Sequence, residues 1–405
     1  MRKCGLLGKK LGHSYSPQIH SMLGEYEYGL YEKTEEELED FVKSGVWDGL
    51  NVTIPYKKSV LPFCDKCSDV AAKIGSVNTM VRQADGTIFG DNTDVYGFLS
   101  LVRKSGIDVK GRKTLVLGSG GAAQAVLEGL SGLGAEAVVI SRSGENHYGN
   151  LAIHSDAEVI VNTTPVGMYP DNLKSPLDLS VFPDLKGVID VIYNPDKTGI
   201  LLQAEERGIP HINGLYMLVA QAKKSSERFT GTEIAEDRIG EITERLAGEM
   251  KNIVLIGMPG SGKTSVAESL AKKLGREIID SDRFIVRRAG MSIPEIFEKE
   301  GEEGFRKLET EVLSEIGKKS SVILSTGGGC VTRKENYPLL HQNGVIFEIK
   351  RDTERLTREG RPLSQGDLTE MYKKRAPMYK AFRDYEIDNN GTIEEAAEKV
   401  AEVMK

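Results

Sequence analysis

Cysteine, long apolar runs and clusters of basic residues are all scarce in this sequence, and each scarcity argues against a class of protein. The 405 residues include only 4 cysteines, too few for a disulfide framework, so a reducing cytoplasm is the expected location. No run approaches the ~18 apolar residues of a membrane span. The opening residues mix apolar side chains with glycine and lysine, so we expect no signal peptide. The net charge is −7 and no long basic run occurs, which argues against nucleic acid or an anionic membrane as a partner.

What the sequence does contain is enough apolar material for several cores. Hydrophobic residues make up 39% and charged residues 28% of the chain, a balance typical of folded globular domains. At ~150 residues per domain, the length corresponds to about 2.7 domains. We find no internal repeat and no low-complexity linker.

Short apolar runs separated by turns or helical segments predict strands along the whole chain. They lie at 4–7, 50–54 and 78–81, then at 114–117, 137–140, 159–161 and 188–192, and finally at 253–256, 277–279, 322–324, 345–349 and 385–387. Thr34 and Glu37 form a capping box that predicts a helix, and Asp85-Gly86 predicts a hairpin turn. The later runs alternate with helical segments, which indicates parallel sheets. Three α/β units result.

One glycine-rich turn, Gly257 through Thr264, matches the pattern G-x-x-x-x-G-K-[ST] between a predicted strand and a predicted helix. Glycines let backbone N–H groups surround phosphate oxygens, while Lys263 reaches the transferred phosphate and the Thr264 hydroxyl can hold Mg²⁺. The next strand ends in Asp280-Ser281-Asp282, at the sheet edge where α/β proteins bind ligands. Its two carboxylates suit a metal and a hydroxyl substrate, although a solvated turn is the alternative.

Further along, Thr326-Gly327-Gly328-Gly329 allows the backbone to approach a ligand closely. Arg306, Arg361 and Arg375 are candidates for binding carboxylate or phosphate, although each one alone could be an ordinary surface arginine.

Together these motifs resemble shikimate kinase, over residues 251–405. The resemblance implies that Asp282 assists deprotonation of the attacking hydroxyl, with Lys263 as the other catalytic residue. It also implies that Asp280 and Thr264 belong to the Mg²⁺ site. The ATP site would comprise Gly260, Ser261, Gly262, Lys263, Thr264, Ser265 and, from a closing lid, Arg361. The shikimate site would comprise Asp282, Arg306, Gly327, Gly328, Gly329 and Arg375. The segment 361–375 is shorter than the lid that this family usually has. This difference concerns the rate of lid closure and not the chemistry.

A second glycine-rich turn, Gly118-x-Gly120-x-x-Ala123, fits the dinucleotide fingerprint. An acidic residue at the end of the following strand would favour NAD, but this strand ends in Ser141-Arg142. Arginine suits a 2′-phosphate, so NADP(H) is favoured, with an ordinary exposed arginine as the alternative. Lys57 and Asp94 are candidates for an acid–base pair, because a partly desolvated lysine near a carboxylate can donate a proton.

The segments Gly-His-Ser-Tyr-Ser-Pro, Asn-Val-Thr-Ile-Pro-Tyr-Lys, Ser-Val-Asn-Thr, Gly-Asp-Asn-Thr-Asp and Asn-Thr-Thr-Pro-Val-Gly-Met resemble shikimate dehydrogenase over roughly residues 1–250. By this resemblance Lys57 and Asp94 are the catalytic pair. The hydroxyacid site would comprise Ser14, Ser16, Thr53, Asn78, Tyr193 and Gln221. The NADP site would comprise Gly118, Ser119, Gly120, Gly121, Ala122, Ser141, Arg142, Thr163 and Met217. Residues 143–146 lack the second basic residue that this family often has there, and the following helix is expected to be truncated.

The two resemblances imply an α/β protein with three parts. A small substrate domain would span 1–101 and 215–249, a Rossmann-like NADP domain 102–214, and a P-loop parallel-sheet domain of the nucleoside monophosphate kinase type 250–405. Residues 235–246 have the spacing of a terminal helix, which leaves 247–250 as the expected linker.

The implied activity is reduction of 3-dehydroshikimate with NADPH, followed by phosphorylation of shikimate with ATP and Mg²⁺. The alternatives are a half that acts on quinate and a catalytically inactive half that senses ligand. The partners would be these small molecules, with no nucleic acid and no membrane, in a monomer or a homodimer. Cys64 and Cys67 form a CxxC without a second pair, so we expect no zinc site.

Overall fold

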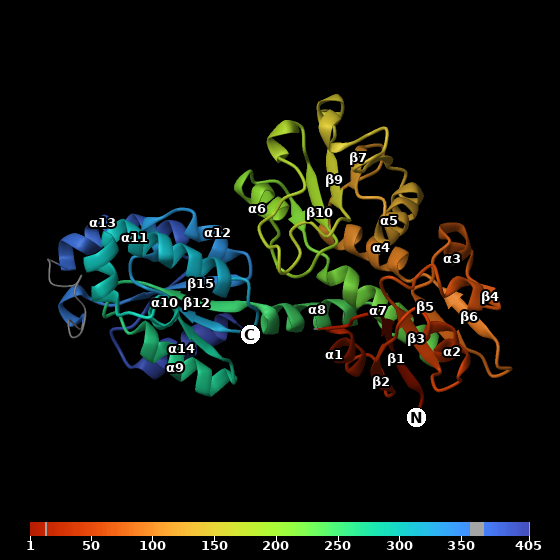
Figure 1. The fold of residues 1–405 in the computed structure, drawn as a ribbon, viewed down its shortest axis with the longest axis horizontal. Helices are drawn as coiled ribbons and strands as arrows, with labels where there is room; N and C mark the ends of the chain where they lie inside the picture. The colour runs from red at the N-terminus through yellow and green to blue at the C-terminus, as the bar shows by residue number, and fades with distance from the viewer. Residues whose placement is uncertain (13, 357–367, 405) are drawn as a thin grey trace. The chain divides into compact units, whose positions relative to one another are not determined.

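The computed structural model describes residues 1–12, 14–356 and 368–404 of the chain, shown in Figure 1. Contacts between residues divide the chain into two compact units. The first unit comprises residues 1–166, 174–193 and 199–244, and the second comprises 167–173, 194–198 and 245–405. The first unit contains two sheets and the second contains one. The fold class predicted from the sequence, mixed α/β with a P-loop domain at the C-terminal end, is therefore confirmed.

The first sheet is built from the N-terminal residues and has the strand order β2-β1-β3-β5-β6-β4. Its strands are β1 (Lys3–Gly8), β2 (Glu27–Glu32), β3 (Gly49–Val52), β4 (Lys66–Cys67), β5 (Thr79–Arg82) and β6 (Ile88–Asp91). β5 pairs with β3 and β6 in antiparallel fashion, and the predicted hairpin at Asp85-Gly86 joins β5 to β6. Gly86 has φ +86°, a backbone conformation that glycine adopts without strain.

Short helices surround this sheet: α1 (Ser16–Ser21), α2 (Leu38–Lys43) and α3 (Asp69–Ile74). One of the two hydrogen bonds of the predicted capping box is present, because Thr34 N–H donates to Glu37 Oε2 at 2.9 Å, but the helix expected from Thr34 begins only at Leu38, with Glu37 as its N-cap. Trp47, Leu50 and Met80 are almost fully buried in the apolar core that these elements share. Two longer helices, α4 (Asp94–Ser105) and α7 (Leu215–Thr230), pack against each other.

The second sheet is entirely parallel, with the strand order β11-β10-β9-β7-β8. Its strands are β7 (Lys113–Leu117), β8 (Glu136–Ile140), β9 (Val159–Asn162), β10 (Gly187–Asp190) and β11 (His211–Ile212), and its helices include α5 (Gly121–Gly132) and α6 (Gly199–Glu206). The chain runs from β7 outward to β8 and then returns to β9 on the other side of β7. This reversal of strand order is the switch point at which open α/β sheets bind nucleotides. Between β8 and β9 there is only a 3₁₀ segment (Tyr148–His154), as expected for a truncated helix.

The third sheet lies in the second unit and is also parallel, in the order β13-β14-β12-β15-β16. Its strands are β12 (Asn252–Ile256), β13 (Ile278–Asp280), β14 (Ile323–Ser325), β15 (Gly344–Lys350) and β16 (Tyr385–Asp388). Helices cover both faces: α9 (Lys263–Leu274) and α14 (Ile393–Val403) on one, and α11 (Ile293–Ile316), α12 (Asn336–His341) and α13 (Leu368–Phe382) on the other (Figure 1). Alternate residues of β12 supply the two cores, because Ile253 packs with α9 and α14 while Val254 packs with α11 and α12.

Helix α8 (Asp237–Met250) corrects one expectation from the sequence. The predicted linker at 247–250 does not exist, since the helix continues through Met250 and β12 begins at Asn252. The carbonyls at this end of the helix have partners from far along the chain. Arg276 donates to the carbonyls of Gly248 and Lys251 at 2.7 and 2.6 Å, and Ser321 Oγ donates to that of Glu249 at 2.6 Å.

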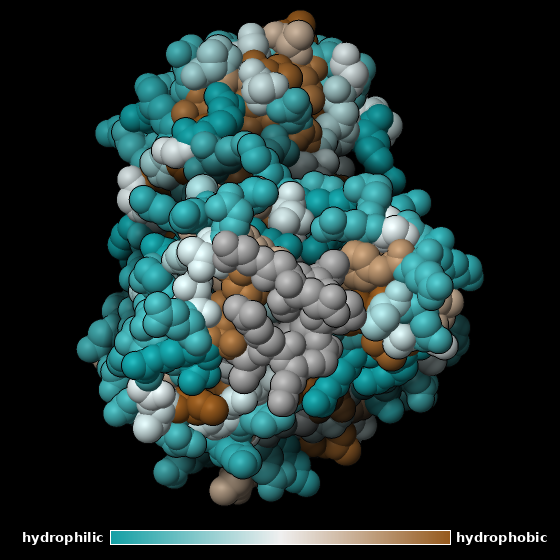
Figure 2. Space-filling model, turned by 90° about the vertical axis from the view of Figure 1, so that its left-hand side faces the viewer, coloured by the Kyte–Doolittle hydropathy of each residue, from teal (hydrophilic) through white to brown (hydrophobic). Residues whose placement is uncertain are grey.

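The surface agrees with the high content of charged residues. Figure 2 shows a face made mostly of hydrophilic residues, on which hydrophobic residues gather only in small patches. Among the residues that the structure describes, no helix combines the length and the apolar character that crossing a membrane requires.

Candidate active sites

A cavity of about 260 Å³ lies in the first unit, between residues of its two sheets and helix α7. It collects side chains that lie far apart in the sequence. All eight residues predicted for the hydroxyacid and its chemistry line it: Ser14, Ser16, Thr53, Lys57, Asn78, Asp94, Tyr193 and Gln221. Met217 and Ala122, which were predicted to bind NADP, line the same cavity.

Lys57 and Asp94 form an ion pair in this cavity. Lys57 Nζ donates to Asp94 Oδ2 at 2.5 Å, and the two side chains are 21% and 11% exposed. Asp94 is the first residue of α4, where Asn92 Oδ1 accepts from its backbone N–H at 3.2 Å. The carbonyl of Lys57 accepts from Val77 N–H at 2.8 Å, which ties the lysine turn to the strand region beside Asn78. A half-buried ammonium held by a carboxylate can donate a proton to a bound carbonyl and take it back from an alcohol.

Aromatic and hydroxyl groups complete the wall of the cavity. Ser14 Oγ accepts from the backbone N–H of Ser16 at 3.2 Å, so the two hydroxyls lie close together at the start of α1. The rings of Tyr15 and Tyr193 meet edge to face with centroids 6.2 Å apart. Burial raises the pKa of Tyr193, so its hydroxyl stays protonated at neutral pH and can donate a hydrogen bond.

The glycine-rich turn after β7 has the geometry of a dinucleotide site. Gly118 has φ +105°, and a Cβ at this position would lie 2.9 Å from Thr163 Oγ1. Thr163 follows β9, on the other side of the switch point, and donates to the Leu117 carbonyl at 2.6 Å. Gly120 and Gly121 open helix α5, and a Cβ on either would meet open space. Backbone N–H groups at a helix N-terminus beside open space suit the pyrophosphate of NADP, so the residues present fit this cofactor.

Ser141 and Arg142 follow β8, the strand next to β7. The turn closes on itself, because Ser141 N–H donates to the Asn146 carbonyl at 3.1 Å and Ser141 bridges to His147. Arg142 is exposed and its charge acts on Tyr148, whose pKa is raised by burial and lowered in part by this arginine. An arginine at this end of β8 is at the position that faces the ribose of a dinucleotide.

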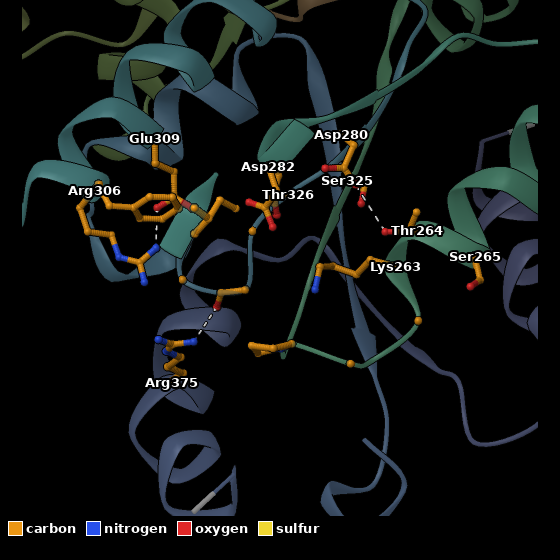
Figure 3. A pocket seen from close by; sticks show the side chains of 18 of the residues that line it. Lys263, Thr264, Ser265, Asp280, Asp282, Arg306, Glu309, Ser325, Thr326 and Arg375 are labelled. Atoms are coloured by element: carbon orange, nitrogen blue, oxygen red, sulfur yellow. Dashed lines mark hydrogen bonds and ion pairs between the residues drawn. The ribbon is translucent and has the colours of Figure 1, made fainter. Parts of the chain in front are cut away.

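A second cavity, of about 340 Å³, lies in the second unit (Figure 3). It is lined by the phosphate-binding turn, the end of β13, helix α11 and the glycine run after β14. Most residues predicted for the kinase reaction line it: Gly260, Gly262, Lys263, Thr264, Ser265, Asp280, Asp282, Arg306, Gly327, Gly328, Gly329 and Arg375. The side chain of Ser261 does not, since it is fully buried behind the turn. Arg361, predicted to lie on a lid, is outside the residues that the structure describes.

The side chains of Lys263 and Asn389 bind the backbone of the phosphate-binding turn. Lys263 Nζ donates to the carbonyls of Gly257 and Met258 at 2.9 and 3.0 Å. Asn389 Nδ2 donates to the Ser261 carbonyl at 2.7 Å. Next to Lys263, Thr264 Oγ1 donates to Asp280 Oδ2 at 3.4 Å. A hydroxyl and a carboxylate so close together form the oxygen donor set that Mg²⁺ prefers, so the residues fit this ion.

Two arginines approach the other end of this cavity. Arg306 is 5% exposed and donates through Nη1 to Glu309 Oε2 at 2.8 Å, while Arg375 Nη1 donates to the Gly328 carbonyl at 3.1 Å. Figure 3 shows both guanidinium groups on the same side of Asp282. Two fixed arginines beside a carboxylate suit a small molecule that carries an anionic group and hydroxyls.

The glycine run is shaped by close contacts with these side chains. A Cβ on Gly327 would lie 2.7 Å from Asp282 Oδ1 and 2.8 Å from Glu309 Oε1. A Cβ on Gly329 would overlap the Arg306 guanidinium. Any larger residue would therefore displace the charged groups that line the cavity.

Glu309 and Asn51 are among the cavity-lining residues for which the sequence did not predict a role. Glu309 lies three residues after Arg306 on α11, a spacing that puts two side chains on one helix face and could have revealed the pair. Burial raises the pKa of Glu309 to about 7, although the charge of Arg306 opposes this shift. Asn51 lies two residues before Thr53, so the period of an extended strand places both on one side.

All four cysteines are free, and the residues that the structure describes contain no group of three or more potential metal-ligating His, Cys, Asp or Glu side chains.

Comparison with known proteins assigns both parts of the chain. The sequence profile of the shikimate dehydrogenase substrate binding domain matches residues 6–80, and that of shikimate kinase matches residues 259–405. A shikimate dehydrogenase (NADP(+)) from Clostridium perfringens is 35% identical over 269 residues, which cover 61% of this chain and 98% of the relative.

Two solved structures show the same likeness. A chorismate mutase/shikimate 5-dehydrogenase fusion protein from Clostridium acetobutylicum is 39% identical with a TM-score of 0.58, covering 60% of this chain and 97% of its own. Shikimate 5-dehydrogenase from Thermus thermophilus, in complex with NADP(H) and shikimate, is 32% identical with a TM-score of 0.56, covering 60% of this chain and 99% of its own. The chain therefore belongs to the shikimate dehydrogenase family, and it carries a shikimate kinase domain at its C-terminal end.

Proposed function

We propose that the first unit reduces 3-dehydroshikimate to shikimate with NADPH and that the second unit phosphorylates shikimate to shikimate 3-phosphate with ATP. One observation supports this proposal above all. Each of two cavities in a single chain brings together the residues that one of these consecutive reactions needs. The product of the first reaction is the substrate of the second, so the two assignments support each other.

In the reduction, NADPH supplies the hydride when it is bound. Lys57 donates the proton to the ketone oxygen, and Asp94 orients the lysine and accepts a hydrogen bond from a neighbouring hydroxyl of the substrate. Ser14 and Ser16 bind the carboxylate of the hydroxyacid. Arg142 binds the 2′-phosphate, so the enzyme prefers NADPH to NADH.

In the phosphorylation, Thr264 and Asp280 hold Mg²⁺ and Lys263 contacts the phosphate that is transferred. Asp282 accepts a hydrogen bond from the attacking hydroxyl and orients it. Arg306 and Arg375 bind the carboxylate of shikimate, which fixes the ring in the cavity. Phosphoryl transfer needs positioning and charge neutralisation more than covalent chemistry, and these residues supply both.

We also assign the substrate domain to residues 1–101 with 215–249, the NADP domain to 102–214 and the kinase domain to 250–405.

The purified chain tests the proposal in two separate assays. With shikimate and NADP⁺ we expect an increase in absorbance from NADPH, and with shikimate, ATP and Mg²⁺ we expect release of ADP together with a phosphorylated product. Quinate in place of shikimate should give a clearly lower kcat/KM in the first assay. A chain that binds shikimate but turns it over in neither assay would instead be a sensor, and the proposal would be wrong.

A further inference from the structure

A chain of buried polar groups lies directly behind the cavity of the first unit. Its centre is Ser225 on α7, which is fully buried, as is Thr79 on β5. Neither residue lines the cavity. Both are nevertheless in contact with residues that do, so they can act on a bound ligand only through those residues.

Ser225 has four polar contacts. Its hydroxyl donates to the Gln221 carbonyl at 2.9 Å and accepts from Asn51 Nδ2 at 2.7 Å. The hydroxyls of Thr79 and Thr93 lie 2.8 and 3.1 Å from it. The single Ser225 proton goes to the carbonyl, so its lone pairs act as acceptors for Asn51 and for one of the two threonines.

The threonines fix the amide of Asn78, which lines the cavity. Thr93 N–H donates to Asn78 Oδ1 at 2.8 Å, and the Thr79 hydroxyl donates to the same oxygen at 3.0 Å. A backbone N–H can only donate, so the orientation of this amide is determined. Asn78 Nδ2 donates one hydrogen to Thr93 Oγ1 at 3.1 Å, and its other hydrogen remains to serve a ligand. Asn78 therefore acts on the substrate as a donor.

The same reasoning applies to Gln221 on the next wall. Gln221 Nε2 donates to the Leu218 carbonyl at 2.9 Å, which a side-chain oxygen could not do. Because the Thr79 proton goes to Asn78 Oδ1, Thr93 is the threonine that donates to Ser225, and its hydroxyl lies 3.5 Å from Gln221 Oε1, beyond the usual length of such a hydrogen bond. The hydroxyl cluster thus sets the amide orientation of Asn78, whereas the Leu218 carbonyl sets that of Gln221.

The other end of the polar chain reaches α1. The Tyr28 hydroxyl donates to Asn51 Oδ1 at 2.8 Å, which turns Asn51 Nδ2 toward Ser225. Burial raises the pKa of Tyr28 well above its usual value, while a hydrogen bond from Ser16 acts in the opposite direction. Tyr28 stays protonated, and through it the chain extends from Ser16 to the Gln221 end of the cavity.

We propose that Ser225 and Thr79 are positioning residues of the dehydrogenase half. Their hydroxyls fix which amide atoms of Asn51 and Asn78 face the substrate, and so contribute to its recognition as a polyhydroxylated ring acid. This inference rests on the proposed function of the first unit. It concerns affinity for the hydroxyacid, not the proton transfer by Lys57.

The first test compares two neighbouring serines. Ser225→Ala removes the centre of the cluster. Ser226→Ala is a matched control, because this serine is equally buried on the same helix but accepts from Tyr26 at 2.9 Å, away from the cavity. Shikimate binding is measured by calorimetry without cofactor, together with KM for shikimate and for NADP⁺, kcat and the Tm. We expect Ser225→Ala to weaken shikimate binding about tenfold, the effect of one hydrogen bond of ordinary strength. Its KM for NADP⁺ should not change, and Ser226→Ala should bind shikimate like the wild type.

A second pair of variants keeps the test decisive should Ser225→Ala fail to fold. Thr79→Val keeps the shape and loses the hydroxyl, whereas Thr79→Ser keeps the hydroxyl and loses a methyl group. A positioning role predicts weaker shikimate binding only for Thr79→Val, while a purely structural role predicts that affinity follows the Tm in both variants.

The outcomes separate this inference from the proposed function. Absence of shikimate binding to the wild-type chain would refute the function itself. Wild-type affinity in Ser225→Ala and Thr79→Val, or an equal loss in Ser226→Ala, would refute the positioning role alone.

Discussion

Replacing Lys57 by methionine tests the dehydrogenase chemistry, and the kinase activity of the same chain serves as a reference. The variant keeps the length of the side chain and removes the ammonium that lies 2.5 Å from Asp94. General acid catalysis contributes roughly 10²–10⁴-fold to rate. At about 1.36 kcal/mol per tenfold change, this corresponds to about 2.7–5.4 kcal/mol of lost transition-state stabilisation. The substitution also leaves the Asp94 carboxylate, whose side chain is only 11% exposed, without its ammonium partner, so we expect the free energy of unfolding to fall as well.

The assay measures kcat for shikimate oxidation and for shikimate phosphorylation in the same preparation. We expect the first rate to fall by two to four orders of magnitude while the second stays near the wild-type value, which corrects for the amount of intact chain in each preparation. Lys58→Met is the matched control, since Lys58 is the next residue, is exposed and does not line the cavity. A Lys57→Met variant that keeps more than about a tenth of the wild-type oxidation rate would refute the assignment of Lys57 as the proton donor.

Three further predictions concern the other groups. Lys263→Ala should abolish phosphorylation and leave the oxidation of shikimate unchanged; loss of both rates would show that the halves do not act independently. Arg142→Ala should narrow the preference for NADPH over NADH about ten- to a hundredfold, mainly through KM, since one charge-assisted contact contributes about 1.5–3 kcal/mol; equal kcat/KM for the two cofactors in the wild type would contradict this. Burial raises the pKa of Glu309 to about 7, so its protonated form favours the folded state at low pH and this contribution is lost as the pH rises through 7. In calorimetric unfolding, the Tm of Glu309→Gln should therefore rise relative to that of the wild type as the pH increases from 5 to 8. Parallel curves of Tm against pH for the two proteins would contradict the raised pKa of Glu309.

The elements that could be predicted are those whose cause is local in the sequence. A phosphate-binding turn must present contiguous backbone N–H groups, so its glycines and Lys263 appear in one short motif. The buried parallel strands β7, β12 and β15 appear as largely apolar runs. By contrast, β2 is a half-exposed strand with a glycine at its centre, and only its pairing with β1 makes it a strand.

The features that were missed depend on contacts between distant residues. The apolar spacing that predicts helix α8 ends at residue 246. In the structure the helix continues to Met250, where Arg276 and Ser321 donate hydrogen bonds to its last carbonyls. Ser225 and Thr79 lie 146 positions apart, and each looks like an isolated polar residue in a core helix or strand. Only the fold shows that they share hydrogen bonds behind a cavity.

The most direct test of the central claim is a single reaction that contains the whole chain, 3-dehydroshikimate, NADPH, ATP and Mg²⁺. The products are followed by ³¹P NMR and by NADPH absorbance. We predict that shikimate 3-phosphate accumulates with one NADPH oxidised and one ATP converted to ADP for each molecule formed, and that omission of either NADPH or ATP prevents its formation. Oxidation of NADPH that stops at shikimate, or formation of no phosphorylated product from 3-dehydroshikimate, would contradict the account of one chain that catalyses two consecutive reactions.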